Sequence, residues 1–577
     1  MEPAEFTCDS NHPVVHLIKK ALYKRRLNCL NWTLELAVLT FVFLPLVVFA
    51  QSAPTAATDP QQKFEKLEEK LNSQQQEIDA LRLELKQALR DQQNVKNQSV
   101  QTTVQPAPVA QPSEAVVAAS AQTAKVEPKD SKRDGSESPL AIHYKNLAII
   151  PGGFLAAESV FRTRNENADM GSDFANLPFD GTANAHLSEF HMSARATRPS
   201  VMLKTEYKGI KITGFEEFDG YGVTAANEVK SNSFSPRQRQ LWIRLDNKNG
   251  WSFTAGQMWS LMVRHSQGMQ TGQEDSAPGD IIEGSFILGH VWERQTGYRI
   301  VKNFNDKVWV GFAAENPQTT YSSTNIPLYM FGLNTSTNAT SSASDVIAYS
   351  SGVADGVSTD LAPDLIAKVA FEPGRGHYEL KGIYRFFRTR ENGVTYKAYG
   401  AGLGVSAKYP LIKSLDFAVE GLAGEGIGRY SSGGGPDITL HPDGSPVPVK
   451  QLHTSAGFEY HTPSKFSAFA YAGNEYYQRA AYVNSNGLGV GYGSTLTNNS
   501  QCEVEVPGYE LPTCTAQNRD IQQAVGGFWY TFFKGPFGTF KYGMNYEHLK
   551  RNTWHAVGGQ PTGQDDIVMT SFRFVLP

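Results

Sequence analysis

The connections between its strand-like segments constrain this chain more than any other feature. From residue 139 to residue 577, stretches of roughly 10 to 18 residues with alternating apolar and polar side chains are separated by turn-forming residues. The short connections carry YKG at Tyr207, DNKNG at Asp246, NFND at Asn303, PGRG at Pro373, PLIK at Pro410, PSK at Pro463 and KGPFG at Lys534. The long connections run near residues 165–183, 222–234, 262–283, 318–363, 431–449, 479–515 and 555–564, with a short exception near 391–395. Short turns at one rim and long loops at the other are typical of a transmembrane β-barrel.

Side chains alternate with a period of two in these segments, as they do in β-strands. One face of residues 539–547 carries Phe540, Tyr542, Met544 and Tyr546, and the other carries Lys541, Asn545 and Glu547. The same pattern assigns Phe190, Met192, Ala194 and Ala196 to one face, opposite Glu189, His191, Ser193 and Arg195. The predicted fold is an all-β transmembrane barrel of about 16 antiparallel strands over residues 139–577, preceded by an α-helical coiled coil.

The composition agrees with a β-protein and excludes a membrane protein built of many helices. The 577 residues include 51 Gly, 24 Tyr and 32 Phe, and only one long apolar run is present. The formal net charge of −4 is small for this length, so bulk charge gives no indication of a nucleic-acid partner.

The N-terminus has the layout of an export signal. Five basic residues between Lys19 and Arg26 precede the apolar run 36–50, and Val48 and Ala50 supply small residues before a cleavage site. We predict that residues 1–50 are a signal peptide. The alternative is an uncleaved anchor, but the run is shorter than the roughly 20 residues that span a bilayer.

Residues 61–96 contain no Gly or Pro and repeat apolar residues in heptads. The a positions hold Phe64, Leu71, Ile78 and Leu85, and the d positions hold Leu67, Gln74, Leu81 and Ala88. A helix this polar has no core of its own, so oligomerisation as a periplasmic coiled coil is favoured over a lone solvated helix. Residues 97–138, rich in Pro, Ala and Ser, are predicted to be a flexible linker.

Two of the four cysteines, Cys8 and Cys29, would leave with the signal peptide. The remaining Cys502 and Cys514 are close in sequence in an exported chain, which predicts a disulfide. Two unpaired thiols are the alternative.

Several segments resemble a known family of channels. The last segment, residues 565–576, alternates Val568, Thr570, Phe572, Phe574 and Leu576 on one face. With RQRQLWIRL at 237–245, WSFTAGQMWSL at 251–261 and the order signal peptide, coiled coil, linker and barrel, the chain resembles the DcaP-like trimeric outer-membrane porins of Gram-negative bacteria. The resemblance implies trimers, a constriction formed partly by the third external loop, and passage of small, often anionic, organic solutes.

Charged residues at inward positions are the candidate pore lining, because the interior of a barrel sets selectivity. The alternation assigns to the interior Arg162, Arg164, Arg195, Arg244, Lys381, Arg385, Lys541 and Arg573, with Glu158, Glu189, Glu379, Asp416, Glu420 and Glu547 as acidic neighbours. These charges either impose a field on passing solutes or pair with one another and only keep the lumen hydrated.

The third external loop supplies a second set of candidates. If it folds inward, as the resemblance implies, the constriction includes Arg264, His265, Glu274, Asp275, Asp280 and Glu283. The alternative is an ordinary external loop with solvated charges.

No enzymatic motif is specific enough to predict catalysis. The sequence HLSEFH at 186–191 lacks the HExxH spacing, and a strand would point its two histidines to opposite faces, so no metal site is predicted. The glycine repeats at 400–404 and 487–493 lack the strand, turn and helix context of a phosphate loop. We therefore predict no catalytic residue and no cofactor.

The sequence predicts a passive diffusion porin in the bacterial outer membrane. Its expected partners are outer-membrane lipid, two further copies of the chain in a homotrimer, and small hydrophilic solutes with a slight preference for anions. The alternative is a structural barrel without an open pore, tethered to the cell wall through its coiled coil.

Overall fold

The computed structural model describes residues 139–222, 235–282, 286–322, 360–391, 393–463, 465–505 and 514–577. The predicted signal peptide (1–50), coiled coil (61–96) and linker (97–138) lie outside the described residues, as does Glu283. Within the described ranges, no helix has the length and apolar character needed to cross a bilayer.

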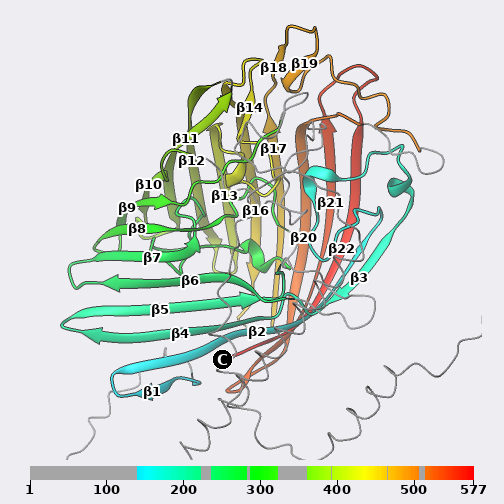
Figure 1. Cartoon of the computed structure of the whole chain (residues 1–577). Helices are drawn as coiled ribbons and strands as arrows, with labels where there is room; N and C mark the ends of the chain where they lie inside the picture. Colours follow the sequence, from blue (N-terminus) through cyan, green and yellow to red (C-terminus); the bar gives the residue numbers. More distant parts are fainter. Residues whose placement is uncertain are drawn as a thin grey trace, which may run out of the picture. The chain divides into compact units, whose positions relative to one another are not determined.

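The described chain forms a closed antiparallel β-barrel of 16 strands, which confirms the predicted fold and strand number (Figure 1). The barrel strands are β2 (Leu147–Arg162), β3 (Glu189–Ser193) continued by β4 (Arg198–Tyr207), β5 (Ile210–Asp219), β6 (Arg237–Asp246), β7 (Trp251–Trp259), β8 (Arg294–Phe304), β9 (Val308–Glu315), β10 (Asp364–Phe371), β11 (His377–Glu391), β12 (Val394–Ile412), β13 (Leu415–Glu425), β16 (Lys450–His461), β17 (Phe466–Tyr477), β20 (Asn518–Gly535), β21 (Gly538–Thr553) and β22 (Thr562–Val575). The short elements are β1 (Ile142–Tyr144), β14 (Ile438–Leu440), β15 (Pro446–Pro448), β18 (Ala480–Val483), β19 (Gly489–Tyr492) and the 3-10 turns η2 (Phe174–Asn176), η3 (Ala183–His186), η4 (Pro278–Asp280) and η6 (Gly428–Tyr430).

Strand β2 closes the barrel. One of its edges pairs with β4 and β3, and the other pairs with β22, in the register Phe154↔Val575. Between β3 and β4 the chain bulges by one residue, and Ala196 in this bulge is buried at 1% exposure. The alternation had placed Ala196 outward; that assignment is wrong because a bulge re-aims the side chains that follow it.

Short turns gather at one rim and long connections at the other. In the turn between β4 and β5, Lys208 and Gly209 both have positive φ (49° and 80°), as a type I′ hairpin requires. We call residues 163–188 loop 1, residues 260–293 loop 3 and residues 426–449 loop 6.

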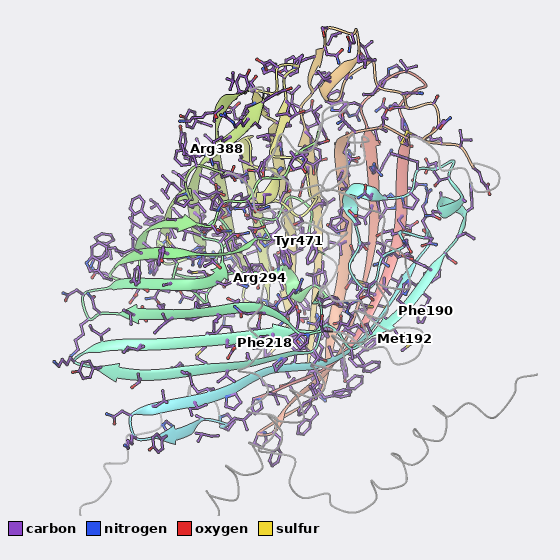
Figure 2. All side chains as sticks on the ribbon, viewed as in Figure 1. Phe190, Met192, Phe218, Arg294, Arg388 and Tyr471 are labelled. Atoms are coloured by element: carbon purple, nitrogen blue, oxygen red, sulfur yellow. A yellow bond between two sulfur atoms is a disulfide. The ribbon has the colours of Figure 1, made fainter. Side chains whose placement is uncertain are left out.

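The outer surface is apolar along the strands. Phe190 and Met192 on β3 are 59% and 68% exposed and point away from the interior (Figure 2). Aromatic rings of neighbouring strands meet on this surface, for example Tyr384 of β11 and Tyr399 of β12 at 5.9 Å between ring centroids. A closed barrel with such a surface suits an apolar surrounding, because every strand edge is paired.

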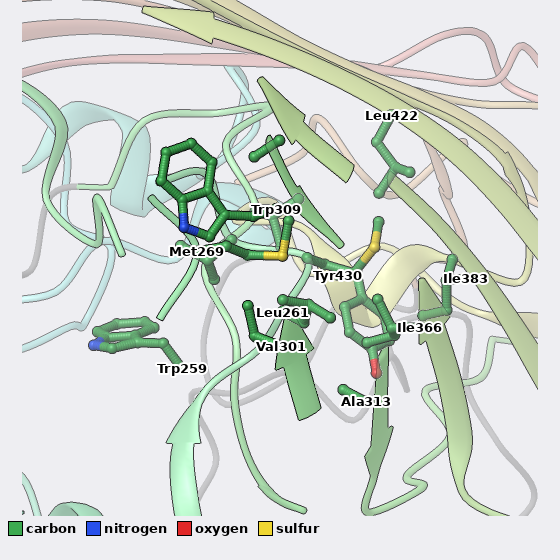
Figure 3. Packing of buried hydrophobic residues seen from close by; sticks show 14 of the residues in the cluster. Trp259, Leu261, Met269, Val301, Trp309, Ala313, Ile366, Ile383, Leu422 and Tyr430 are labelled. Atoms are coloured by element: carbon green, nitrogen blue, oxygen red, sulfur yellow. The ribbon is translucent and has the colours of Figure 1, made fainter. Parts of the chain in front are cut away.

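The interior contains a packed apolar core. Trp259 and Leu261 lie against inward residues of the wall such as Trp309 and Ile366, together with Tyr430 of loop 6 (Figure 3). A second cluster packs Ile281 and Ile287 of loop 3 against Phe469 and Tyr471 of β17. The barrel is therefore partly filled, and not lined by polar side chains throughout.

A charged residue on the outer surface is expected to destabilise the barrel in lipid. Leu403 on β12 is 70% exposed. We predict that Leu403→Arg lowers the free energy of unfolding in phospholipid vesicles by about 2–4 kcal/mol, the cost of an arginine at mid-bilayer depth. Urea titration measures this. Leu496→Arg, at a 49% exposed position in the connection after β17, is the control and should cost little. Equal costs would contradict a lipid-facing surface.

Candidate functional site

Loop 3 crosses the lumen instead of extending from the rim. It leaves β7 and returns at β8, yet its residues contact the inner wall of β10, β11, β13, β16, β17 and β20. A loop in this position must find partners for its backbone groups, because unpaired buried amides and carbonyls are costly. The charged side chains of the wall supply these partners.

Wall carboxylates accept hydrogen bonds from the loop backbone. The bonds are Leu261 N to Glu315 Oε1 (2.8 Å), His265 N to Glu379 Oε1 (3.0 Å), Gly279 N to Glu459 Oε1 (2.9 Å) and Gly289 N to Glu475 Oε1 (3.0 Å). Hydrogen bonds of amides to ionised carboxylates are stronger than those between neutral groups. These four contacts fix loop 3 at several points along its length.

Wall lysines hold the loop carbonyls in the same way. Lys368 Nζ donates to Val263 O and Lys381 Nζ to Met262 O, each at 2.7 Å. Lys368 also donates to His265 Nδ1 at 2.9 Å. Burial lowers the pKa of His265 to about 4, and the Lys368 ammonium acts in the same direction. The imidazole is therefore neutral at pH 7 and accepts this hydrogen bond.

The same side chains form buried ion pairs. Lys368 lies 2.6 Å from Glu379, Lys381 pairs with Glu420, and Arg385 pairs with Asp364 at 3.1 Å and with Asp437. Lys381 and Arg385 thus face the interior, as the alternation predicts, but both are at most 1% exposed. We call the interior face of β8 to β17, covered by loop 3, the closed side.

The opposite part of the lumen remains accessible. On β4, Ser200, Met202 and Lys204 alternate with the outward Val201 and Leu203, and none of the three is buried. We call the interior face of β4 the open side.

Cations and aromatic rings alternate along the wall beside the open side. Arg198 of β4 lies over the ring of Phe154 at 5.2 Å, and Arg573 of β22 lies over the same ring at 4.6 Å. Arg573 also lies 4.9 Å from the ring of Trp529, and Lys541 lies 4.2 Å from it. We call these five residues, from β4, β2, β22, β20 and β21, the cation ladder.

Loop 3 meets the cation ladder at Asp280. Trp529 Nε1 donates to Asp280 O at 2.5 Å, and Lys541 Nζ lies 3.5 Å from Asp280 Oδ2. The Asp280 side chain is 65% exposed, so its carboxylate borders accessible space. Behind the ladder, Glu158 pairs with Arg573 at 2.8 Å. Three cations and two carboxylates therefore stand where loop 3 approaches the wall.

The other predicted pore-lining residues lie apart from the ladder. Near loop 1, Arg162 pairs with Glu189 (2.8 Å), Arg164 with Asp180 (2.6 Å) and Arg195 with Asp169. Arg244 of β6 pairs with Asp246 at 2.8 Å and donates to Thr271 O of loop 3. The contacts of these arginines hold loop 1 and loop 3.

Four of the predicted constriction residues, Arg264, His265, Glu274 and Asp275, lie where loop 3 crosses the lumen. Arg264 lies 2.6 Å from Asp275, and Glu274 lies 2.7 Å from Arg299 of β8. His265 and Glu274 form a β-bridge within the loop. In the connection between β17 and β20, a disulfide joins Cys502 and Cys514.

Sequence reasoning did not identify Lys368, Arg198, Phe154 or Trp529. Each occupies an inward position of a strand, so the alternation of side chains could have predicted that it faces the interior. The partner across the lumen could not be inferred from one strand. In the described part of the chain, no group of three or more His, Cys, Asp or Glu side chains is arranged to hold a metal ion.

Comparison with known proteins shows a likeness in structure and none in sequence. No protein-family model and no curated protein matches the chain. The crystal structure of the outer membrane channel DcaP of Acinetobacter baumannii is similar, with a TM-score of 0.53 and 15% identity over 75% of this chain and 99% of that chain. The predicted resemblance to DcaP is confirmed at the level of the fold.

Two other porins are similar at lower scores. They are an anion-selective porin from Comamonas acidovorans (TM-score 0.39, 10% identity, 74% of this chain and 100% of that chain) and Salmonella typhi OmpF (0.38, 12%, 75% and 100%).

The Lys381 and Glu420 pair offers a test of how loop 3 is held. We predict that Lys381→Met lowers the free energy of unfolding by about 3–5 kcal/mol, because the buried Glu420 carboxylate loses its lysine, although it keeps its contact with His290 Nδ1 at 2.5 Å. Urea titration of Lys381→Met, Glu420→Gln and the double variant should show that the double costs less than the sum. The pair Arg164 and Asp180, in which the Asp180 side chain is 46% exposed, is the control, with an expected coupling below about 1 kcal/mol. Additive effects at Lys381 and Glu420 would contradict the anchoring role.

Glu166 of loop 1 gives the site a pH dependence. Burial raises its pKa to about 8, opposed by Arg162 and assisted by Asp565. The neutral carboxyl is favoured by folding, so its contribution to stability is complete below pH 4.5 and is lost as the pH rises through about 8. We predict that Glu166→Gln flattens the fall in unfolding free energy between pH 5 and pH 9. Parallel curves for both proteins would refute this.

Proposed function

We propose that the chain is a passive diffusion channel of the bacterial outer membrane for small hydrophilic solutes, with a preference for anions. The observation that supports it is a closed barrel similar in fold to DcaP. In this barrel loop 3 folds inward and narrows the lumen beside the cation ladder. We further propose that three copies assemble, with the coiled coil in the periplasm.

Loop 3 would set the size of solute that passes. Its backbone is fixed by the wall carboxylates and lysines of the closed side, so the remaining path runs along β4 and the ladder. Side chains held at several points move little, and the width of the path is then determined by packing and not by a mobile loop.

The cation ladder would set the charge preference. Arg198, Arg573 and Lys541 follow one another along it, and Glu158 and Asp280 pair with Arg573 and Lys541. Charges that line a narrow aqueous path with apolar walls focus the field and raise the local concentration of counter-ions. Phe154 and Trp529 hold the guanidinium and ammonium groups over their ring faces and so keep them in place.

A second candidate function is a structural barrel without an open pore. The apolar core that fills the closed side favours it, because this part of the lumen cannot conduct. The two functions differ in one measurable property, which is current through the folded protein.

Ion conduction in planar bilayers tests the proposal. We predict three-step openings and a reversal potential with the sign of an anion-preferring pore under a salt gradient. Arg198→Gln and Lys541→Gln should each shift the reversal potential toward cations. Lys413→Gln, in the exposed turn after β12, removes the same charge away from the lumen and should leave it unchanged.

Absence of current from protein shown to be folded would overturn the channel and favour the structural barrel. An unchanged reversal potential in Arg198→Gln and Lys541→Gln would overturn the role of the ladder.

A further inference from the structure

The long-loop rim contains a cavity that the cation ladder does not reach. It has a volume of about 590 Å³ and lies between loop 1, loop 3, loop 6 and the ends of β5 and β6. Cavities of this size hold small organic molecules in other proteins. Its walls divide into a charged part and an aromatic part.

Two ion pairs face the charged part. Arg195 pairs with Asp169, and the two side chains are 16% and 29% exposed. Arg237 pairs with Asp219 at 2.7 Å and is 34% exposed. Both guanidinium groups lie 5.3 Å from the centroid of the Tyr221 ring.

The charges of the lining balance. Asp169 and Asp173 are acidic residues of the cavity wall, and Arg195 and Arg237 are its basic residues. Glu166 also lines the cavity, but burial keeps its carboxyl protonated at pH 7, since its pKa is raised to about 8. A solute of one sign would therefore meet as much repulsion as attraction.

The aromatic part comes from loop 3. Phe286 and Trp292 both line the cavity, with 4.2 Å between their ring centroids. Aromatic faces take up apolar groups and also attract ammonium groups. On the loop 6 side, a Cβ at Gly434 would meet nothing within 4 Å, so the cavity keeps open space there.

We propose that this cavity binds small zwitterions with an apolar body, of the size and chemistry of a free aromatic amino acid. The ammonium group pairs with Asp169, the carboxylate pairs with Arg237, and the apolar body lies against Phe286 and Trp292. The inference rests on the proposed channel function, in which the cavity is a binding step at the long-loop mouth before the solute reaches the ladder.

Three probes of similar shape distinguish the contribution of the ligand's ammonium group from that of its carboxylate. Phenylalanine carries both, 3-phenylpropionate lacks the ammonium group, and phenethylamine lacks the carboxylate. Calorimetric titration of the full chain in detergent should show that phenylalanine binds at least about tenfold more tightly than either single-charge probe, since each lost charge pair is worth about one decade in affinity.

Two substitutions assign the ends of the ligand. Asp169→Asn should weaken the binding of phenylalanine and phenethylamine and should not weaken the binding of 3-phenylpropionate, and Arg195 keeps its bond to Gly220 O at 3.0 Å. Arg237→Gln should weaken the binding of phenylalanine and of 3-phenylpropionate. Asp219 keeps a partner in this variant, because Arg239 lies 2.8 Å from it. Asp443→Asn, at an exposed position in loop 6 away from the cavity lining, is the matched control.

Equal affinity for the three probes, or no binding of phenylalanine, would overturn this inference and leave the channel intact if the same protein conducts. Binding of phenylalanine by a folded protein that passes no current would support the cavity and overturn the channel. The two proposals therefore fail by separate measurements.

Discussion

The structure depends on hydrogen bonds between charged side chains of the barrel wall and the backbone of loop 3. A loop inside a barrel carries amides and carbonyls that solvent cannot fully satisfy, and each unsatisfied group costs free energy. Glu379 accepts from an amide of this loop, and Lys368 and Lys381 donate to its carbonyls. Because these ionic groups also pair with one another, their burial is compensated and the loop is held in one place.

This arrangement divides the lumen into two sides with different properties. On the closed side, apolar residues such as Trp309 and Ile366 pack against loop 3 and exclude water. On the open side, polar residues of β4 stay accessible, and Arg573 and Lys541 stand over aromatic rings. The carboxylates and lysines that anchor loop 3 on the closed side are thus separate from the cation ladder, which contacts loop 3 at Asp280.

Much of the barrel followed from local rules of sequence. The period of two gave the strands and their outward faces, and turn residues such as Lys208 and Gly209 marked the short rim. These features depend on neighbouring residues only. The bulge that buries Ala196 was not predicted, because its register is set by β2, which lies far away in sequence. The coiled coil and signal peptide remain predictions.

The site was predictable in outline and not in its contacts. Alternation showed that Lys381 and Arg385 face inward, but their partners come from loop 3 and loop 6, so a charge that faces inward need not face water. The role of the inward apolar residues Ile366 and Ile383 could not be predicted, because the residues that pack against them come from loops distant in sequence. Ladder members sit on five strands, and only barrel closure brings them together.

Thiol accessibility tests the division of the lumen most directly. Single cysteines replace Ser200 on the open side, which is not buried, and Ser455 on the closed side, which is 4% exposed. The chain without its predicted signal peptide suits this test, because Cys502 and Cys514 are joined in a disulfide. A charged methanethiosulfonate reagent added during bilayer recording should reduce the current through Ser200→Cys and leave Ser455→Cys unaffected. Block of Ser455→Cys, with Ser200→Cys unaffected, would contradict the account.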